Sequence, residues 1–147
     1  MTLHRALHKA LLLGLPLLLA ACGGDERPRA TVDRVDLQRY AGTWHEIARL
    51  PQWFQRGCYN STATYSLNDD GSVKVINRCQ REGEAASVAE GEARVVPGSH
   101  NAKLKVRFDN WFSRLLPKVT EGNYWIIALD KDYRTVVVGE PGRDYLW

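Results

Sequence analysis

Apolar and charged positions alternate most clearly in the segment 103–108. Its even-numbered positions are Leu104, Val106 and Phe108, and its odd-numbered positions are Lys103, Lys105 and Arg107. Successive side chains of a β-strand point to opposite faces of the sheet. This period of two therefore predicts a strand with one apolar face and one cationic face.

Similar patterns predict further strands along the chain. A helical turn over 36–40, capped by Asp36, should precede them. The expected strands are 44–50, 61–67, 72–79, 87–96, 123–129 and 134–139, and 144–147 should begin an eighth. Turn sequences separate several of them, namely Asn68-Asp69-Asp70-Gly71, Pro97-Gly98 and Pro141-Gly142. Closely spaced strands without a long helix between them favour an all-β barrel or sandwich.

The first residues have the pattern of an export signal. Arg5 and Lys9 precede an apolar run, 10–21, which is too short to span a bilayer and ends in small residues before Cys22. An ordinary signal peptide is one interpretation. The quartet Leu19-Ala20-Ala21-Cys22 also resembles the bacterial lipobox, which implies removal of residues 1–21 and lipidation of Cys22. The polar stretch that follows predicts a flexible tether within 22–35, before a single domain over 36–147.

Charge and cysteine content narrow the class of protein. Loss of Arg5 and Lys9 with the signal lowers the formal charge from +3 to +1, so nucleic acid is not an expected partner. Cys58 and Cys79 form an even pair in an oxidising compartment, where a disulfide is expected. Free thiols or a metal pair are the alternatives. The two cysteines lie at the same end of a predicted hairpin but are not strictly opposed, so a bridge needs a diagonal pairing or a bulge.

Several motifs together resemble the bacterial outer-membrane lipocalins. Gly42-Thr43-Trp44 matches the Gly-x-Trp motif of that family, within the wider string 40–49. Further matches are Thr62-Ala63-Thr64-Tyr65 with Asp69-Asp70-Gly71, then Asp130-Lys131-Asp132-Tyr133, then Asp144-Tyr145-Leu146-Trp147. The resemblance implies an up-and-down antiparallel eight-stranded barrel, with Gly42 and the Trp44 indole at its floor.

One part of the family pattern is missing. The family carries an Arg on its last strand, a few residues after the segment matched by 145–147, and a helix beyond it. The sequence ends at Trp147. We therefore expect a partial chain with an incomplete last strand, in which Trp44 lacks its covering Arg.

The resemblance also implies an interior that holds one lipid. Alternation groups residues on one face of each strand, and the resemblance implies that this face points inward. It holds 73, 91 and 128 together with the expected lining residues: Ala63, Tyr65, Val75, Asn77, Ala93, Val95, Leu104, Val106, Phe108, Tyr124 and Ile126. Small residues such as Gly91 and Ala93 are expected to leave volume. The family implies fatty acids or lysophospholipids as ligands, for envelope maintenance, with Asn77, Tyr65 and Tyr124 as candidate contacts for the polar head. A filled barrel without a ligand is the alternative.

The remaining expectations concern partners and chemistry. His45, Glu46, His100 and Asp130 form no recognisable catalytic pattern, and no metal or phosphate motif is present, so we expect no enzyme, no metal and no cofactor. Two apolar loops, 50–54 and 111–116, either cover the barrel or contact a membrane surface. The expected state is a monomer or homodimer, lipid-anchored in the outer membrane and facing the periplasm.

Overall fold

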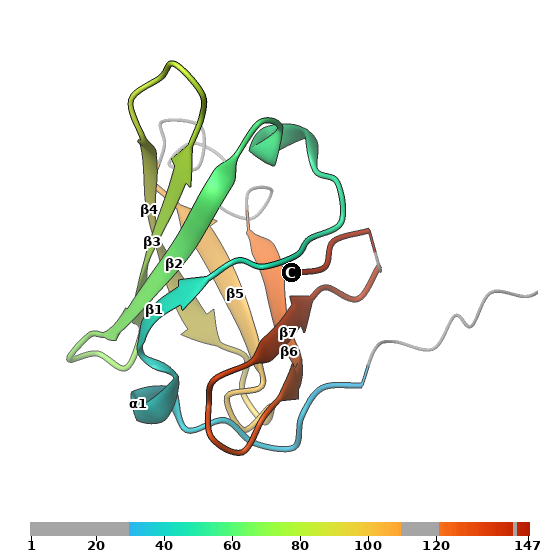
Figure 1. The fold of residues 1–147 in the computed structure, drawn as a ribbon. Helices are drawn as coiled ribbons and strands as arrows, with labels where there is room; N and C mark the ends of the chain where they lie inside the picture. Colours follow the sequence, from blue (N-terminus) through green and yellow to red (C-terminus); the bar gives the residue numbers. More distant parts are fainter. Residues whose placement is uncertain (1–29, 110–120, 143) are drawn as a thin grey trace, which may run out of the picture.

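The computed structural model describes residues 30–109, 121–142 and 144–147. The expected signal peptide, Cys22, most of the tether and the 111–116 loop lie outside the described residues. A short helix, α1 (Leu37–Tyr40), precedes seven strands (Figure 1). These are β1 (Gly42–His45), β2 (Tyr59–Leu67), β3 (Val73–Gln80), β4 (Ser87–Val95), β5 (Lys103–Phe108), β6 (Gly122–Leu129) and β7 (Val136–Gly139), with a 3-10 turn, η1 (Trp53–Gln55), between β1 and β2.

The strands form one antiparallel sheet in the order of the sequence, as an up-and-down barrel requires. The sheet curls around a common interior (Figure 1). The predicted eighth strand is represented by Leu146, which bridges to Gly139, and by Trp147, whose backbone exchanges two hydrogen bonds of 2.8 Å with Val138. The all-β lipocalin-type barrel expected from the sequence is therefore confirmed in its architecture.

One end of the barrel is covered by the chain that precedes the strands. Val32 N–H donates to the carbonyl of Ile126, and Val35 N–H donates to that of His100. Helix α1 begins as predicted, since the Asp36 carboxylate accepts from the N–H groups of Gln38 and Arg39. We call this the closed end. At the other end, which we call the open end, lie the loop 46–58, the β3–β4 turn and the segments 140–142 and 144–147 (Figure 1).

Two predicted strand boundaries were wrong, and side-chain hydrogen bonds explain both. The first strand ends at His45 rather than Leu50, because the Arg49 guanidinium donates to the carbonyls of Gln55 and Cys58 and draws this segment into a loop. The seventh begins at Val136 rather than Arg134. The backbone N–H groups of residues 134 and 135 donate instead to the Asp130 carboxylate, which keeps them in the preceding turn.

The predicted disulfide is present, and a bulge lies beside it. Cys58 and Cys79 are bonded, with their Cα atoms 5.3 Å apart. The register of β2 against β3 slips between Tyr59 and Thr62, at a residue, Asn60, whose φ is +47°. A bulge was one of the two irregularities expected from the spacing of the cysteines, and the other was a diagonal pairing. With Tyr59 paired to Gln80, the two cysteines also remain diagonal to one another.

The hydrophobic core lies toward the closed end. Its fully buried members are Val35, Tyr40, Val73, Val75, Ala93, Ala102, Leu104 and Ile126. Across the described residues, no helix has the length and hydropathy needed to cross a membrane.

Candidate ligand-binding site

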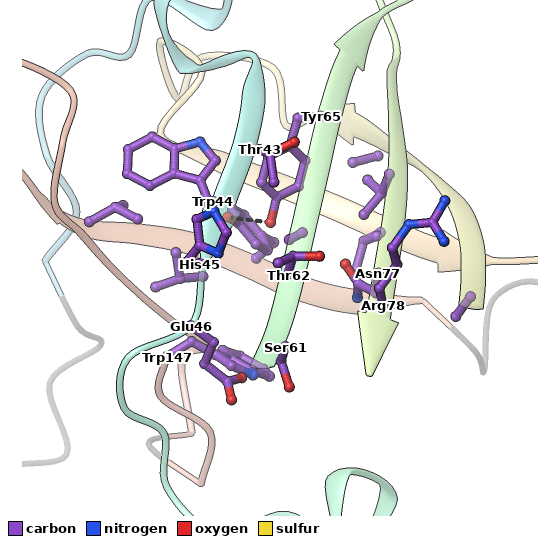
Figure 2. Close-up of a pocket in the computed structure, with 18 of the residues that line it drawn as sticks. Thr43, Trp44, His45, Glu46, Ser61, Thr62, Tyr65, Asn77, Arg78 and Trp147 are labelled. Atoms are coloured by element: carbon purple, nitrogen blue, oxygen red, sulfur yellow. Dashed lines mark hydrogen bonds between the residues drawn. The ribbon is translucent and has the colours of Figure 1, made fainter. Parts of the chain in front are cut away.

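A cavity of about 1350 Å³ occupies the interior of the sheet. Its apolar wall runs along several strands and includes Ala63, Val73, Val75, Ala93, Leu104, Val106 and Phe108. Residues of the loop 46–58 and of the segment 145–147 border it at the open end. Figure 2 shows Tyr65 toward one end of this view and Ser61, Glu46 and Trp147 toward the other. The volume lies above the roughly 300–1,000 Å³ typical of small-molecule sites.

Three tyrosine hydroxyls meet in the closed half of the cavity. The Tyr124 hydroxyl lies 2.7 Å from that of Tyr40 and 2.9 Å from that of Tyr65. Burial raises the pKa of Tyr65 to about 12. Burial also raises the pKa values of Tyr40 and Tyr124, and repulsion by the charge of ionised Tyr65 raises them further. All three groups are therefore neutral hydroxyls at physiological pH.

Trp44 and Gly42 lie beside this cluster, at the floor that the family motif implied. The Trp44 indole N–H donates to the Tyr40 carbonyl at 2.9 Å, and the two rings stack with centroids 4.9 Å apart. Gly42 has a φ of +120°, a conformation that favours glycine where the chain leaves α1 for β1. The motif thus ties the start of the sheet to the closed end.

Outside the tyrosine cluster, the wall carries two polar atoms without a protein partner. Asn77 Oδ1 and Ser61 Oγ are buried and have no hydrogen-bond partner among the described residues. Asn77 stands between Ala63 and Ala89 in the register of the sheet, and Figure 2 shows it and Ser61 on neighbouring strands. A buried acceptor of this kind favours a ligand or water that donates a hydrogen bond.

Most of the predicted lining residues border the cavity, but some do not. Val95 packs on the core cluster, and Ile126 is fully buried beneath the segment 32–35, so neither lies on the cavity wall. Ala128 is exposed because a bulge between Ile126 and Ala128 shifts the alternation, and Leu129 packs on the core instead. The prediction for these three positions was wrong because the coverage of the closed end and the bulge are tertiary features.

Gly91 also differs from its expected role. A Cβ at this position would lie 2.5 Å from the Arg107 carbonyl and 2.9 Å from a ring carbon of Phe108. The glycine therefore allows β5 and the Phe108 ring to approach β4 closely, and the Phe108 ring takes up the space there. The expectation that Gly91 leaves volume for a ligand was wrong.

The three polar residues proposed for a head group are not together. Asn77 lies near the middle of the wall, whereas Tyr65 and Tyr124 join Tyr40 toward the closed end. Sequence reasoning missed Tyr40 as a cavity residue because it precedes the first strand. Its position two residues before Gly42 was the one available signal.

The open end is bordered by an anchored loop. The Arg49 guanidinium pairs with Glu46 and also holds two loop carbonyls, and Arg81 Nε donates to the Arg56 carbonyl. Trp53 nevertheless remains 77% exposed and Phe54 45% exposed. Both side chains also border the cavity, so the two interpretations of this loop, a cover over the barrel and a membrane contact, both stay predictions.

The rejected catalytic candidates have structural roles or lie apart. The Glu46 carboxylate holds the loop through Arg49. Asp130 accepts from the backbone N–H groups of the β6–β7 turn, and those bonds, that from Thr135 first, lower the pKa of its carboxyl group. His100 occupies a turn position with a φ of +49°. No group of three or more potential metal ligands occurs among residues 30–109, 121–142 and 144–147.

The family assignment now rests on a direct match. The family model Lipocalin-like domain matches residues 35–147, the whole of the barrel just described. The chain is a lipocalin. Proteins of this family are generally binding proteins rather than enzymes, in keeping with a cavity whose wall is mainly apolar.

Relatives from distant organisms support the assignment. Outer membrane lipoprotein Blc of Escherichia coli (strain K12) is 41% identical over 133 residues, which are 88% of this chain and 71% of that protein. Blc of Citrobacter freundii gives the same values. Temperature-induced lipocalin-1 of Arabidopsis thaliana is 34% identical over 125 residues, 84% of this chain and 66% of that one. The chain is therefore a lipocalin of the Blc type.

Solved structures support the fold. Insecticyanin from the tobacco hornworm, Manduca sexta, superposes with a TM-score of 0.58 at 20% sequence identity. The match covers 82% of this chain and 62% of insecticyanin. At this level of identity the comparison concerns the architecture of the barrel alone.

Proposed function

We propose that this lipocalin is an outer-membrane lipoprotein, anchored through Cys22 and facing the periplasm, that binds fatty acids or lysophospholipids for storage or transport. The observation that carries the proposal is the large, mainly apolar cavity bordered by the anchored loop. The printed name of the Blc relatives, outer membrane lipoprotein, supports the location. The lipobox-like quartet supports the anchor.

The energetics favour a ligand with a long acyl chain. Each buried methylene contributes roughly 0.8 kcal/mol, so one chain supplies ample gross binding energy before ordering costs are subtracted. Between the tyrosine cluster and the polar residues nearer the open end, such as Ser61, the wall formed by Val73, Val75, Ala93, Leu104, Val106 and Phe108 is aliphatic and aromatic. Open volume of this size argues against the alternative of a filled, purely structural barrel.

Native mass spectrometry of the full chain, combined with lipid extraction, tests the proposal. We expect a co-purifying lipid or saturable binding of added palmitic acid. Ala93→Trp should abolish that binding, because Ala93 is buried on the cavity wall and an indole there occupies the ligand's space. Ala128→Trp is the matched control, since it adds the same bulk at an exposed position. Absence of binding by the folded parent chain would refute the proposal.

A further inference from the structure

The three tyrosines of the closed half have one more hydroxyl proton than they use among themselves. Each hydroxyl has one proton to donate and two lone pairs that accept. Tyr124 lies within hydrogen-bond distance of Tyr40 and of Tyr65, so the cluster contains two hydrogen bonds and three protons. Whichever way those two bonds run, one O–H is left over, and no other hydrogen bond joins these hydroxyls to a described residue.

The cluster faces the ligand space rather than the solvent. All three tyrosines border the cavity, and Tyr40 is almost fully buried. The surrounding side chains are apolar: Val73, Val75 and Leu104 pack around the cluster, with Trp44 stacked on Tyr40. A spare donor in such surroundings is costly unless something in the cavity accepts its proton.

We propose that the hydroxyl cluster of Tyr40, Tyr65 and Tyr124 is a binding subsite for an uncharged oxygen on the distal part of an acyl chain. This subsite deepens the proposed function and rests on it. The ligand class it selects is the oxygenated lipid, with a hydroxyl, carbonyl or epoxide oxygen toward the end of its chain.

The depth of the tyrosine cluster and the cost of burying a charge there together favour this class of ligand. Tyr65 lies four residues from Ser61 along β2, which is about 13 Å at the rise of a strand, so a chain that enters at the open end reaches the cluster with its far end. A carboxylate in the same place would lose its hydration and gain one hydroxyl donor. Such a burial is unfavourable, whereas an uncharged oxygen loses far less on transfer.

The test compares three ligands by displacement of a fluorescent fatty acid from the full chain: palmitic acid, ω-hydroxypalmitic acid and α-hydroxypalmitic acid. The wild-type chain should bind ω-hydroxypalmitic acid at least as tightly as palmitic acid, because the cluster compensates the buried hydroxyl. Binding more than about tenfold weaker, the penalty of an unpaired buried hydroxyl, would overturn the proposal. This measurement needs no variant.

The triple variant Tyr40→Phe/Tyr65→Phe/Tyr124→Phe removes every donor while keeping the three rings. We expect the affinity for ω-hydroxypalmitic acid relative to palmitic acid to fall about tenfold. Tyr65→Phe alone should keep the ratio of the two affinities close to that of the wild-type chain, since the remaining two hydroxyls share one bond and retain one spare proton. Tyr59→Phe, an exposed position on the same strand, is the matched control.

The other outcomes separate this inference from the proposed function. If palmitic acid binds and the triple variant leaves the ratio unchanged, the subsite is refuted and lipid binding stands. If the triple variant loses as much affinity for α-hydroxypalmitic acid, or for palmitic acid itself, as for ω-hydroxypalmitic acid, the cluster contacts the head group. Either result would also refute the subsite. If none of the three acids displaces the probe, both proposals fall.

Discussion

Removal of the Cys58–Cys79 disulfide should lower the stability of the barrel by about 3 kcal/mol. The two cysteines are 21 residues apart in the sequence, and a closed loop of that length restricts the unfolded chain by about this amount in the chain-entropy treatment. In the folded state Cys58 is held independently, since its N–H donates to the Gln55 carbonyl and its carbonyl accepts from Arg49. The folded geometry should therefore survive, and the effect should act mainly on the unfolded state.

The assay is urea denaturation of the double variant Cys58→Ala/Cys79→Ala against the parent chain. For a barrel of this size, about 3 kcal/mol corresponds to a fall in the thermal midpoint of roughly 12 °C. The slope of the free energy with urea concentration should rise, because the unlinked chain exposes more surface when it unfolds. Palmitic acid affinity should change little.

Reduction provides the internal control. The parent chain under reducing conditions should reproduce the midpoint of the double variant, and reductant should have no further effect on that variant. A loss of less than about 1 kcal/mol would refute the reasoning, because it would mean that the hairpin already restricts the unfolded chain without the bond. Loss of the barrel itself would also refute it, because the disulfide would then be needed to build the folded state.

Three further predictions follow from other parts of the molecule. Cys22→Ala should give protein that is soluble or uncleaved, and normal membrane fractionation of that variant would contradict the proposed anchor. The pKa of Tyr65 is raised from 10.0 to about 12, so its neutral hydroxyl should stabilise the barrel fully below pH 10. That contribution should be lost as the pH rises toward 12. The free energy of unfolding of the triple Tyr→Phe variant should therefore depend less on pH over this range. Arg49→Ala should increase hydrogen exchange in the loop 46–58, since two loop carbonyls lose a donor and Glu46 loses its ion-pair partner. Unchanged exchange would show that the disulfide and the remaining hydrogen bonds fix the loop without Arg49.

Much of the sheet could be predicted because its signals are local. The alternation at 103–108 predicts β5, and the Asp70-Gly71 turn predicts the β2–β3 hairpin. That hairpin in turn places Cys58 and Cys79 at one end but not strictly opposed, which predicts the diagonal pairing or bulge that a bridge between them needs. In each case a few neighbouring residues determine the backbone geometry, so the inference needs no knowledge of distant contacts.

The errors occur where distant contacts determine the outcome. The first strand ends early because the Arg49 side chain binds loop carbonyls up to nine residues away. The alternation of β6 fails at Ala128 because a bulge inserts one residue before it, and nothing in the local composition marks that site. A period-two pattern identifies the inward face only as far as the strand remains regular.

The cavity shows a second limit of the period-two pattern, which does not predict how deep in the barrel a side chain lies. Val75 and Ile126 both occupy predicted inward positions, yet Val75 borders the ligand space and Ile126 is covered by the segment that crosses the closed end. Sequence alternation gives the face of a side chain but not its depth along the barrel. The same limit applies to Tyr65 and Tyr124, which alternation and the family resemblance together place inward, whereas only the path of the chain through α1 brings Tyr40 beside them. The polar end of this binding site is therefore a product of closure at the floor, and the variants that alter the tyrosines test that closure and the ligand class together.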